Sequence, residues 1–183
     1  MAIVAIAALL GPACSSSATT VPGCAHVDDS VFALMAQSVP TATRLPCLRE
    51  LPVGWTFTGL QIRNGRSQLW LDSTIAGPHA VEVDLRDACD VNEAVEVPPA
   101  PDEIGMRSFV EPDRPPGFAG VRFLLFDGGC VAYRYRFAGN APPTLALEAE
   151  EALSFVEREA VVTSVDNELD QVLCGAGAPP CEG

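Results

Sequence analysis

The sequence contains no lysine, and all 11 of its basic residues are arginine. Against these stand 24 acidic residues, so the formal net charge is −13. Affinity for nucleic acids comes largely from basic side chains that contact phosphates, and this charge balance therefore argues against DNA or RNA as a partner. It equally disfavours an anionic membrane surface. We interpret the acidity as a feature that keeps the folded protein soluble.

The common signatures of catalysis and metal binding are also missing. The chain has only two histidines, His26 and His79, and no CxxC pair, so neither a zinc site nor a thioredoxin-like redox site is supported. No GxSxG elbow, GxGxxG loop or P-loop occurs. Asp166-x-Glu168-x-Asp170 is acidic, but it lies on a predicted helix, where positions i and i+2 do not face each other. We therefore predict no catalytic residue, no metal site and no cofactor, and we favour a non-enzymatic protein over an enzyme.

The chain begins with an apolar run, Ala2 to Leu10 (AIVAIAALL). The run is too short to span a bilayer, but it fits the apolar region of a secretory signal. Gly11-Pro12-Ala13-Cys14 follows, and residues 15–20 are all Ser, Thr or Ala. No Lys or Arg precedes Arg44, so the basic start of a signal is missing, and we expect the natural start to lie upstream of Met1.

This arrangement resembles a bacterial lipoprotein leader, in which small residues precede a cysteine that is lipidated and then followed by a flexible tether. The resemblance implies that residues 1–13 are a signal peptide, that Cys14 is the lipidated mature N-terminus, and that residues 14–26 form the tether. It places the protein outside the cytoplasm, anchored to the cell membrane by its lipid. A plain secretory signal cleaved after Ala13 is the main alternative and would make the protein secreted. A buried N-terminal strand or helix is a third interpretation.

An odd number of cysteines in an exported protein leaves one cysteine without a partner inside the chain. Lipidation of Cys14 would account for that residue and leave six for three disulfides. We favour the pairs Cys24–Cys47, Cys89–Cys130 and Cys174–Cys181. The first would join the N-terminal region to the segment before the first strand, the second would join a hairpin to an earlier loop, and the third would close the Gly/Pro-rich tail. Long-loop disulfides of this kind each contribute about 2–4 kcal/mol to stability.

The clearest structural signal is Gly120 to Phe137 (GVRFLLFDGGCVAYRYRF), which reads as two strands around Asp127-Gly128-Gly129. A two-residue turn would pair Phe126 with Gly129, whereas a three-residue turn with a bulge would pair Phe126 with Cys130. The three-residue turn segregates apolar residues onto one face more cleanly, so we predict that register. The opposite face remains mixed, so we expect another segment to cover it near Cys130.

Alternating patterns predict further strands over residues 55–62, 67–73 and 80–86, with Asn64-Gly65 as the turn between the first two. If the third strand neighbours the hairpin, its outward carboxylates Glu82 and Asp84 would face the hairpin arginines, which are Arg122, Arg134 and Arg136. Residues 28–30 are expected to cap a short helix over 31–37. Arg44 to Pro52 is expected to form a turn of helix or an extended connector.

The segment from Glu93 to Pro116 is rich in acid and proline. We interpret it as a long irregular loop with a short edge strand over residues 106–110, and as the place to look for partner contacts. After Pro142-Pro143, apolar stripes predict one long bent helix or two helices that end at Gly175. Ser154-x-x-Glu157 is expected to be the capping box of the second helix.

These elements predict an α+β fold with a single domain over residues 27–183. Its antiparallel, mostly meandering sheet of four to six strands would pack against C-terminal helices and be stapled by disulfides. The predicted function is that of a cell-envelope lipoprotein, a non-enzymatic module that binds an envelope protein or a small ligand of unknown identity.

Two other functions stay open at this point. One is an envelope hydrolase with carboxylate acid/base residues, which would need a concave pocket that holds two carboxylates, one of them with a raised pKa. The other is a carrier of an apolar small ligand, which would need a large cavity lined by Val and Phe side chains between the sheet and the helices.

Overall fold

The computed structural model describes residues 16–18, 20–27, 30–111, 118–169 and 172–175. Its strands and helices are β1 Ser16–Ala18, α1 Ser30–Ser38, β2 Arg44–Leu48, β3 Trp55–Arg63, β4 Arg66–Ser73, β5 Gly77–Arg86, β6 Val95–Val97, β7 Arg107–Glu111, β8 Ala119–Phe126, β9 Gly129–Arg136, α2 Leu145–Ala152, β10 Leu153–Glu157 and α3 Arg158–Leu169. The predicted α+β fold with an antiparallel sheet and C-terminal helices is confirmed.

The main sheet has eight strands in the order β1-β3-β4-β5-β9-β8-β7-β6, which is more than the predicted four to six. Two meanders, β3-β4-β5 and β6-β7-β8-β9, are joined where β5 pairs with β9. A separate two-stranded sheet is formed by β2 and β10. The strands predicted around Asn64-Gly65 are present as β3 and β4, and the alternating segment after Gly77 is β5.

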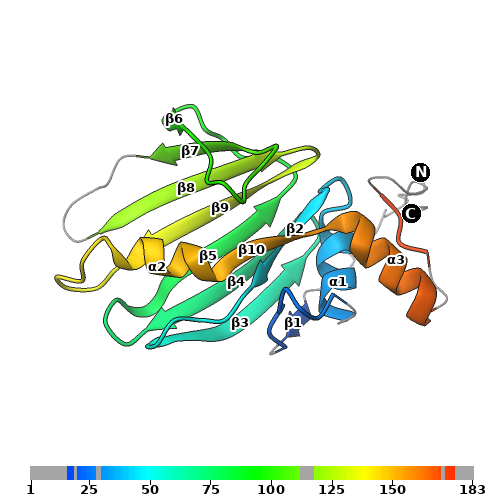
Figure 1. Ribbon diagram of the computed structural model, residues 1–183, viewed down its shortest axis with the longest axis horizontal. Coiled ribbons are helices and arrows are strands. Elements are labelled where there is room, and N and C mark those ends of the chain that lie inside the picture. Colours follow the sequence, from blue (N-terminus) through cyan, green and yellow to red (C-terminus); the bar gives the residue numbers. More distant parts are fainter. Residues whose placement is uncertain (1–15, 19, 28–29, 112–117, 170–171, 176–183) are drawn as a thin grey trace, which may run out of the picture.

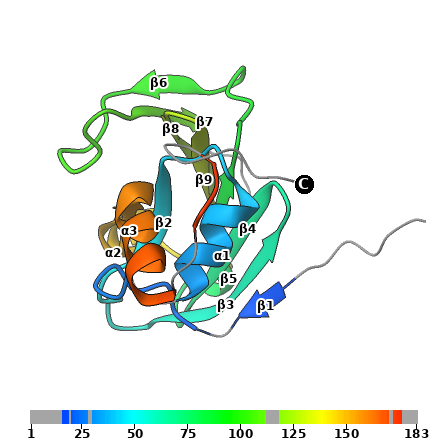
Figure 2. The ribbon, with the colours of Figure 1, turned by 90° about the vertical axis from the view of Figure 1, so that its right-hand side faces the viewer.

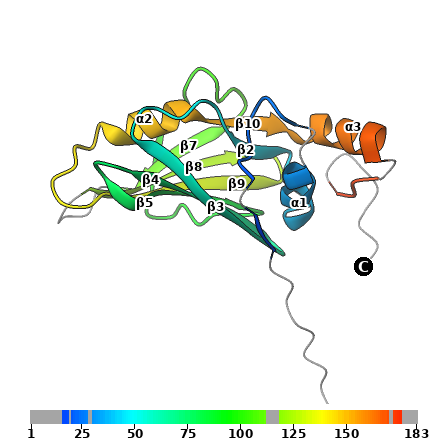
Figure 3. The same cartoon turned by 90° about the horizontal axis from the view of Figure 1, so that it is seen from below.

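One face of the main sheet is covered and is called the inner face below. In Figure 1, α2, β10 and α3 follow one another across this face, and Figure 3 shows them together on one side of the sheet. Inner-face residues such as Leu69, Val83 and Val131 are at most 1% exposed and pack in one core with Phe32 and Met35 of α1. None of the helices in the described ranges is both long and apolar enough to cross a membrane.

The β8–β9 hairpin has the two-residue register, so the predicted three-residue turn is wrong. Phe126 pairs with Gly129, and Gly128 holds the turn with a φ of +69°. The prediction assumed that only one face of the hairpin is covered. On the inner face, Leu124 and Val131 are fully buried, while on the outer face Phe123 is only 3% exposed. Because both faces bury apolar side chains, segregation onto one face could not identify the register.

A small outer core covers the hairpin near Cys130, as expected from the mixed character of that face. Phe109, Phe123 and Ala132 form this core, and Val91 and Ala94 of the loop before β6 pack on it. The Cys89–Cys130 disulfide attaches that loop to β9. The curved outer edge of the sheet, with β6 and β7 beyond β8, is visible end-on in Figure 2.

Charged side chains of β4, β5 and β9 form a ladder on the outer face. Asp84 is fully buried and accepts two hydrogen bonds from Arg66, at 2.6 and 2.7 Å, and one from Arg86 at 2.9 Å. Arg134 lies 3.9 Å from both Asp84 and Glu82. The predicted pairing of these carboxylates with Arg134 is therefore present, but Arg122 points to the inner face instead. Since these ion pairs join β4, β5 and β9, they favour the observed register of β5 with both of its neighbours.

The segment predicted as a long loop, Glu93 to Pro116, contains two strands. The predicted strand over residues 106–110 is present as β7, but it is not an edge strand, because β6 pairs on its far side. Between β6 and β7, residues 98–106 return over the inner face. The prediction missed β6 because three residues, Val95 to Val97, are too few for a periodicity signal.

The predicted capping box at Ser154-x-x-Glu157 is wrong, because these residues belong to β10. Leu153 to Glu157 pairs with β2, with Ser154 opposite Cys47 and Val156 opposite Leu45. The helix resumes at Arg158, so α2 and α3 are separated by a strand. A Ser-x-x-Glu pattern depends only on neighbouring residues in the chain. Pairing with β2, which is distant in the sequence, makes this segment a strand instead.

Two of the three favoured disulfides, Cys24–Cys47 and Cys89–Cys130, are formed. Cys174 also takes part in a disulfide, and its predicted partner Cys181 lies outside the described residues. Residues 1–13 and Cys14 also lie outside them. The described part of the predicted 14–26 tether packs against the domain, since β1 pairs with β3 and the Cys24 N–H donates to the Leu48 carbonyl at 3.0 Å.

Candidate functional site

A cavity of about 370 Å³ opens on the inner face between the sheet and the segment that crosses it. We call it the inner-face pocket. Its floor is formed by Arg122 of β8 and Tyr133 of β9, which are opposite each other in the register. Its remaining walls come from the 98–106 segment, from α2 and β10, and from the residue that follows β2; they are Ala100, Asp102, Glu103, Leu147, Glu150, Glu151, Leu153, Ser154, Phe155 and Arg49.

Arg122 is the central charge of the pocket, and its side chain is 14% exposed. Its guanidinium donates to Glu150 at 2.5 Å, to Glu103 at 2.8 Å and to the Ser108 hydroxyl at 3.1 Å. Burial acts to lower the pKa of Arg122, but the carboxylates of Glu150 and Glu103 outweigh it and raise that pKa above its ordinary value. The network joins β7, β8, α2 and the 98–106 segment at one point.

The two tyrosines of β9 lie beside this network. The Tyr135 hydroxyl donates to Glu150 at 2.5 Å, and its pKa is raised well above 10 by burial and by the Glu150 carboxylate. Tyr133 is only 2% exposed and lines the pocket, and burial together with the Glu103 charge raises its pKa too. No residue in the described ranges forms a hydrogen bond with the Tyr133 hydroxyl. That hydroxyl is thus a neutral donor and acceptor that faces the cavity.

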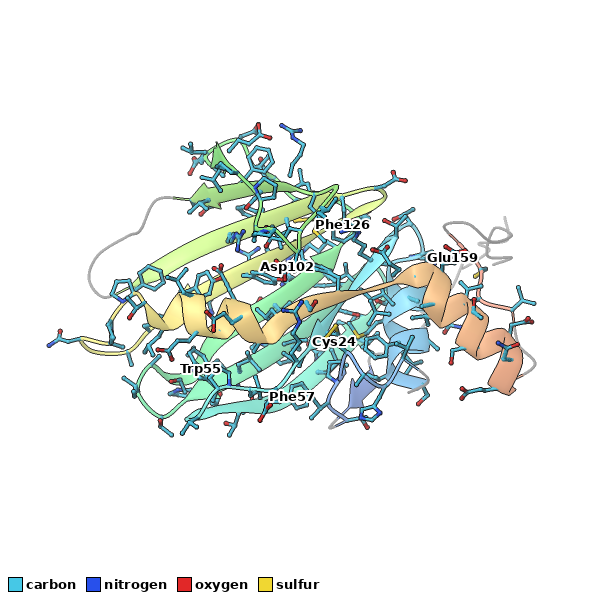
Figure 4. The ribbon with its side chains drawn as sticks, viewed as in Figure 1. Cys24, Trp55, Phe57, Asp102, Phe126 and Glu159 are labelled. Carbon is cyan, nitrogen blue, oxygen red and sulfur yellow. A yellow bond between two sulfur atoms is a disulfide. The ribbon has the colours of Figure 1, made fainter. Side chains whose placement is uncertain are left out.

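The mouth of the pocket is bridged by an exposed ion pair. Arg49 donates to Asp102 at 3.1 Å and to the Ser154 hydroxyl at 2.9 Å, and both charged side chains are about half exposed. Figure 4 shows Asp102 on the segment that returns over the strands, close to where β10 crosses them. An exposed pair of this kind contributes roughly 0–1 kcal/mol, so it can open at little cost.

None of the predicted site residues lies in this pocket, but the segment predicted as the place to look for partner contacts, Glu93 to Pro116, contributes Ala100, Asp102 and Glu103 to its lining. The predicted lipidation site Cys14 is outside the described residues, and the disulfides staple other parts of the domain. Asp166 and Glu168 lie on α3, away from the pocket lining. Across the ranges that the structure describes, no group of three His, Cys, Asp or Glu side chains is arranged to hold a metal ion.

Sequence reasoning missed Arg122, Glu103 and Glu150 as site residues. They come from β8, from the 98–106 segment and from α2, which are far apart in the chain. One signal was present: Arg122 interrupts an apolar strand pattern, and an arginine on a covered face needs carboxylate partners. The sequence offers 24 acidic residues as candidates, so the partners themselves could not be selected.

Searches of protein-family models, of curated proteins and of solved structures find no match to this chain.

Proposed function

We propose that this chain is an exported lipoprotein of the cell envelope, anchored by a lipid on Cys14, whose domain binds a small ligand in the inner-face pocket without chemically changing it. The observation that carries the binding proposal is the pocket itself. Its charged floor is fixed in place by Arg122 and its two carboxylates, while no residue that the structure describes bonds the Tyr133 hydroxyl. Fixed polar groups around a cavity of this size are typical of small-molecule sites.

The disulfides support the exported location. Cys24–Cys47 and Cys89–Cys130 join segments that are 23 and 41 residues apart. Such bridges persist in oxidising compartments outside the cytoplasm and are rare within it. The two disulfides therefore fit a location outside the cytoplasm, either in the envelope through the lipid anchor or as a secreted protein.

The hydrolase alternative is less well supported than binding. A glycosidase-type pair needs one carboxyl group that is free to give up a proton and another that is free to act as nucleophile or base. In the pocket, Glu150 uses one oxygen for Arg122 and the other for Tyr135, and Glu103 is bound to Arg122 and to the Ala100 N–H. Glu103 and Glu150 are thus already engaged in structural contacts, and the other two lining carboxylates, Asp102 and Glu151, are exposed side chains.

The apolar-carrier alternative does not fit the lining. Among the described lining residues there is no valine and a single phenylalanine, Phe155, whereas two arginines and four carboxylates are present. An apolar ligand in this site would remove water from the charged side chains without replacing the hydrogen bonds to that water, which costs free energy.

Intact mass of the protein from the membrane fraction of its native host tests the location. We expect a mature chain that starts at Cys14, carries a diacylglyceryl group and gains six alkyl groups only after reduction. An unprocessed chain with free thiols would contradict export, lipidation and the disulfides together.

Correlation NMR of the labelled domain with a library of small polar fragments tests the binding site. We expect that fragments shift the amide signals of Ala100, Glu103 and Glu151 and leave the outer-face strands unchanged. Fragments that shift only outer-face signals would refute the pocket as the binding site.

A further inference from the structure

We infer that the ligand of the inner-face pocket is an organic cation, a protonated amine carried on a flat apolar body; the inference rests on the proposed binding function. It follows from three independent features of the pocket: an excess of negative charge, carboxylate oxygens without partners, and an aromatic wall next to a free hydroxyl.

The charge of the lining favours a cation. Two arginines and four carboxylates line the cavity, so the lining carries two more negative charges than positive ones; these residues are Arg49, Arg122, Asp102, Glu103, Glu150 and Glu151. Both arginines are committed, since Arg122 bonds Glu103, Glu150 and Ser108, and Arg49 bonds Asp102 and Ser154. An anionic ligand would find no uncommitted arginine in the lining and would meet the excess carboxylates.

Several carboxylate oxygens remain available to a donor. In contacts with the described residues, Glu103 uses only Oε2 and Asp102 uses only Oδ2. Within the described part of the chain, the Glu151 carboxylate has no hydrogen-bond or ion-pair partner. A protonated amine has up to three N–H donors, so it can engage several of these oxygens together.

The Tyr133 hydroxyl is the second, independent indication of a ligand. Tyr133 is only 2% exposed and lines the pocket. Its hydroxyl forms no hydrogen bond with any residue that the structure describes. The hydroxyl oxygen itself is accessible from the cavity, because Arg158 Nε is the one fully enclosed side-chain polar atom without a partner in the described residues, so water or a ligand in the cavity can bond it. A phenol oxygen accepts from an ammonium group as readily as it donates to a carbonyl.

The wall formed by Phe155, Leu147 and Leu153 suits an apolar body attached to the amine. Phe155 packs edge-on against Phe126, with ring centroids 5.8 Å apart, so its ring is held in a fixed position. An aromatic face near a cation adds favourable electrostatic attraction. The lining of one cavity thus offers both apolar surface and acidic oxygens.

Three matched fragments test this inference on the full exported domain: benzylamine, benzyl alcohol and benzoate, which share a ring and differ in charge. We expect benzylamine to bind most tightly in NMR titrations, with shifts at pocket amides that weaken as salt rises. Benzoate is expected to bind most weakly, because it would meet the excess carboxylates.

Three variants locate the contact. Tyr133→Phe is expected to weaken benzylamine binding at least about tenfold, the value of one hydrogen bond to a charged group, without loss of thermal stability because no described residue bonds the hydroxyl. Glu151→Gln is expected to weaken it about two- to fivefold. Glu148→Gln is the matched control, because Glu148 lies on the same helix but outside the pocket, and it should bind benzylamine like the unmodified chain.

The outcomes separate the two proposals. If benzyl alcohol or benzoate binds at the pocket amides as tightly as benzylamine, the cation inference falls and the binding function stands. If Tyr133→Phe and Glu151→Gln bind benzylamine no more weakly than Glu148→Gln, the inference falls as well. If no fragment shifts a pocket amide at millimolar concentration, both the inference and the pocket as a binding site fall.

Discussion

Arg122 shows how one buried charge organises the pocket. Its guanidinium meets three acceptors from three different elements, Glu103, Ser108 and Glu150. A buried arginine without such acceptors would carry a large desolvation cost, and so would its carboxylate partners without the arginine. Arg122, Glu103 and Glu150 are therefore stable in a buried position only when they are in contact with one another. This makes the 98–106 segment and α2 parts of one site.

Arg158 is a contrasting buried arginine at the start of α3. It is 2% exposed and donates to the backbone carbonyls of Ala36 and Cys174, at 2.8 and 2.6 Å, rather than to a carboxylate. Burial lowers its pKa. Since carbonyl oxygens at the end of α1 carry partial negative charge, they are suitable acceptors for a buried cation. Arg158 thus joins α1, α3 and the Cys174 segment, and it has a structural role.

The tyrosines give a prediction about pH at the scale of single residues. The chain has 2 tyrosines, Tyr133 and Tyr135, and burial is the first cause that raises the pKa of both. Carboxylates of Glu103 and Glu150 add to it, and Arg122 opposes it. In the unfolded chain both hydroxyls lose their protons near pH 10, the ordinary value, while the folded chain retains them.

The folded state therefore binds more protons above pH 10, and stability falls as pH rises. The slope reaches about 1.4 kcal/mol per pH unit for each tyrosine. Near-ultraviolet absorbance of tyrosinate after a rapid pH jump checks this, with the guanidinium-unfolded chain as the control. Tyrosinate that appears in the native protein at the same pH as in the unfolded control would contradict the burial of both rings.

At the scale of elements, the β8–β9 hairpin is held at its tip as well as along its strands. The Asp127 carbonyl accepts hydrogen bonds from the Thr43 hydroxyl at 2.7 Å and from the Thr43 N–H at 3.3 Å. Gly128 lies so close to the Thr41 carbonyl that a Cβ there would overlap it. The link between α1 and β2 thus contacts the turn directly and supports its two-residue form.

A comparison of the two hairpin glycines distinguishes the effect of this contact on stability from the effect of backbone strain. Gly65 and Gly128 have similar φ values, +78° and +69°, but no atom lies within 4 Å of a Cβ built on Gly65. Gly65→Ala is expected to cost about 1–2 kcal/mol, the penalty of a left-handed alanine. Gly128→Ala is expected to cost about 1–3 kcal/mol more, because the backbone around Thr41 must move.

Urea unfolding of the two alanine variants measures the difference. Equal losses of unfolding free energy would mean that the hairpin tip does not contact the α1–β2 link in solution, and the explanation of the register would have to change.

At the scale of the whole molecule, the two described disulfides lie on opposite sides of the main sheet. Cys24–Cys47 joins the segment after β1 to β2, on the covered side, and Cys89–Cys130 joins the loop before β6 to β9, over the outer core. Figure 4 marks Cys24 beneath the crossing of β10. Cys24–Cys47 lies at the large inner core, and Cys89 packs against the small outer core.

Removal of each bridge by a double Cys→Ala exchange is expected to cost about 3–4 kcal/mol in the chain-entropy description. The loss should be larger for Cys89–Cys130, which spans 41 residues, than for Cys24–Cys47, which spans 23. Calorimetry of both double variants, with and without reductant, makes the comparison. A variant as stable as the unmodified chain would show that its bridge does not constrain the unfolded state.

The sequence alone determined the features that depend on local chemistry. Alternation in residues 55–86 and the Asn64-Gly65 turn specify the β3–β4–β5 meander, because side-chain period and turn geometry are local properties. The α+β class follows from the same patterns together with the helical stripe after Pro143.

Only the tertiary structure decided the hairpin register, the strand β10 and the inner-face pocket. Both faces of β8 and β9 bury apolar side chains, so their pattern is compatible with two registers until the covering segments are known. Ser154 to Glu157 becomes a strand because β2 is available to pair with it. Arg122, Glu103 and Glu150 form a site because folding brings together charges from three distant segments, and no local pattern in the chain encodes that meeting.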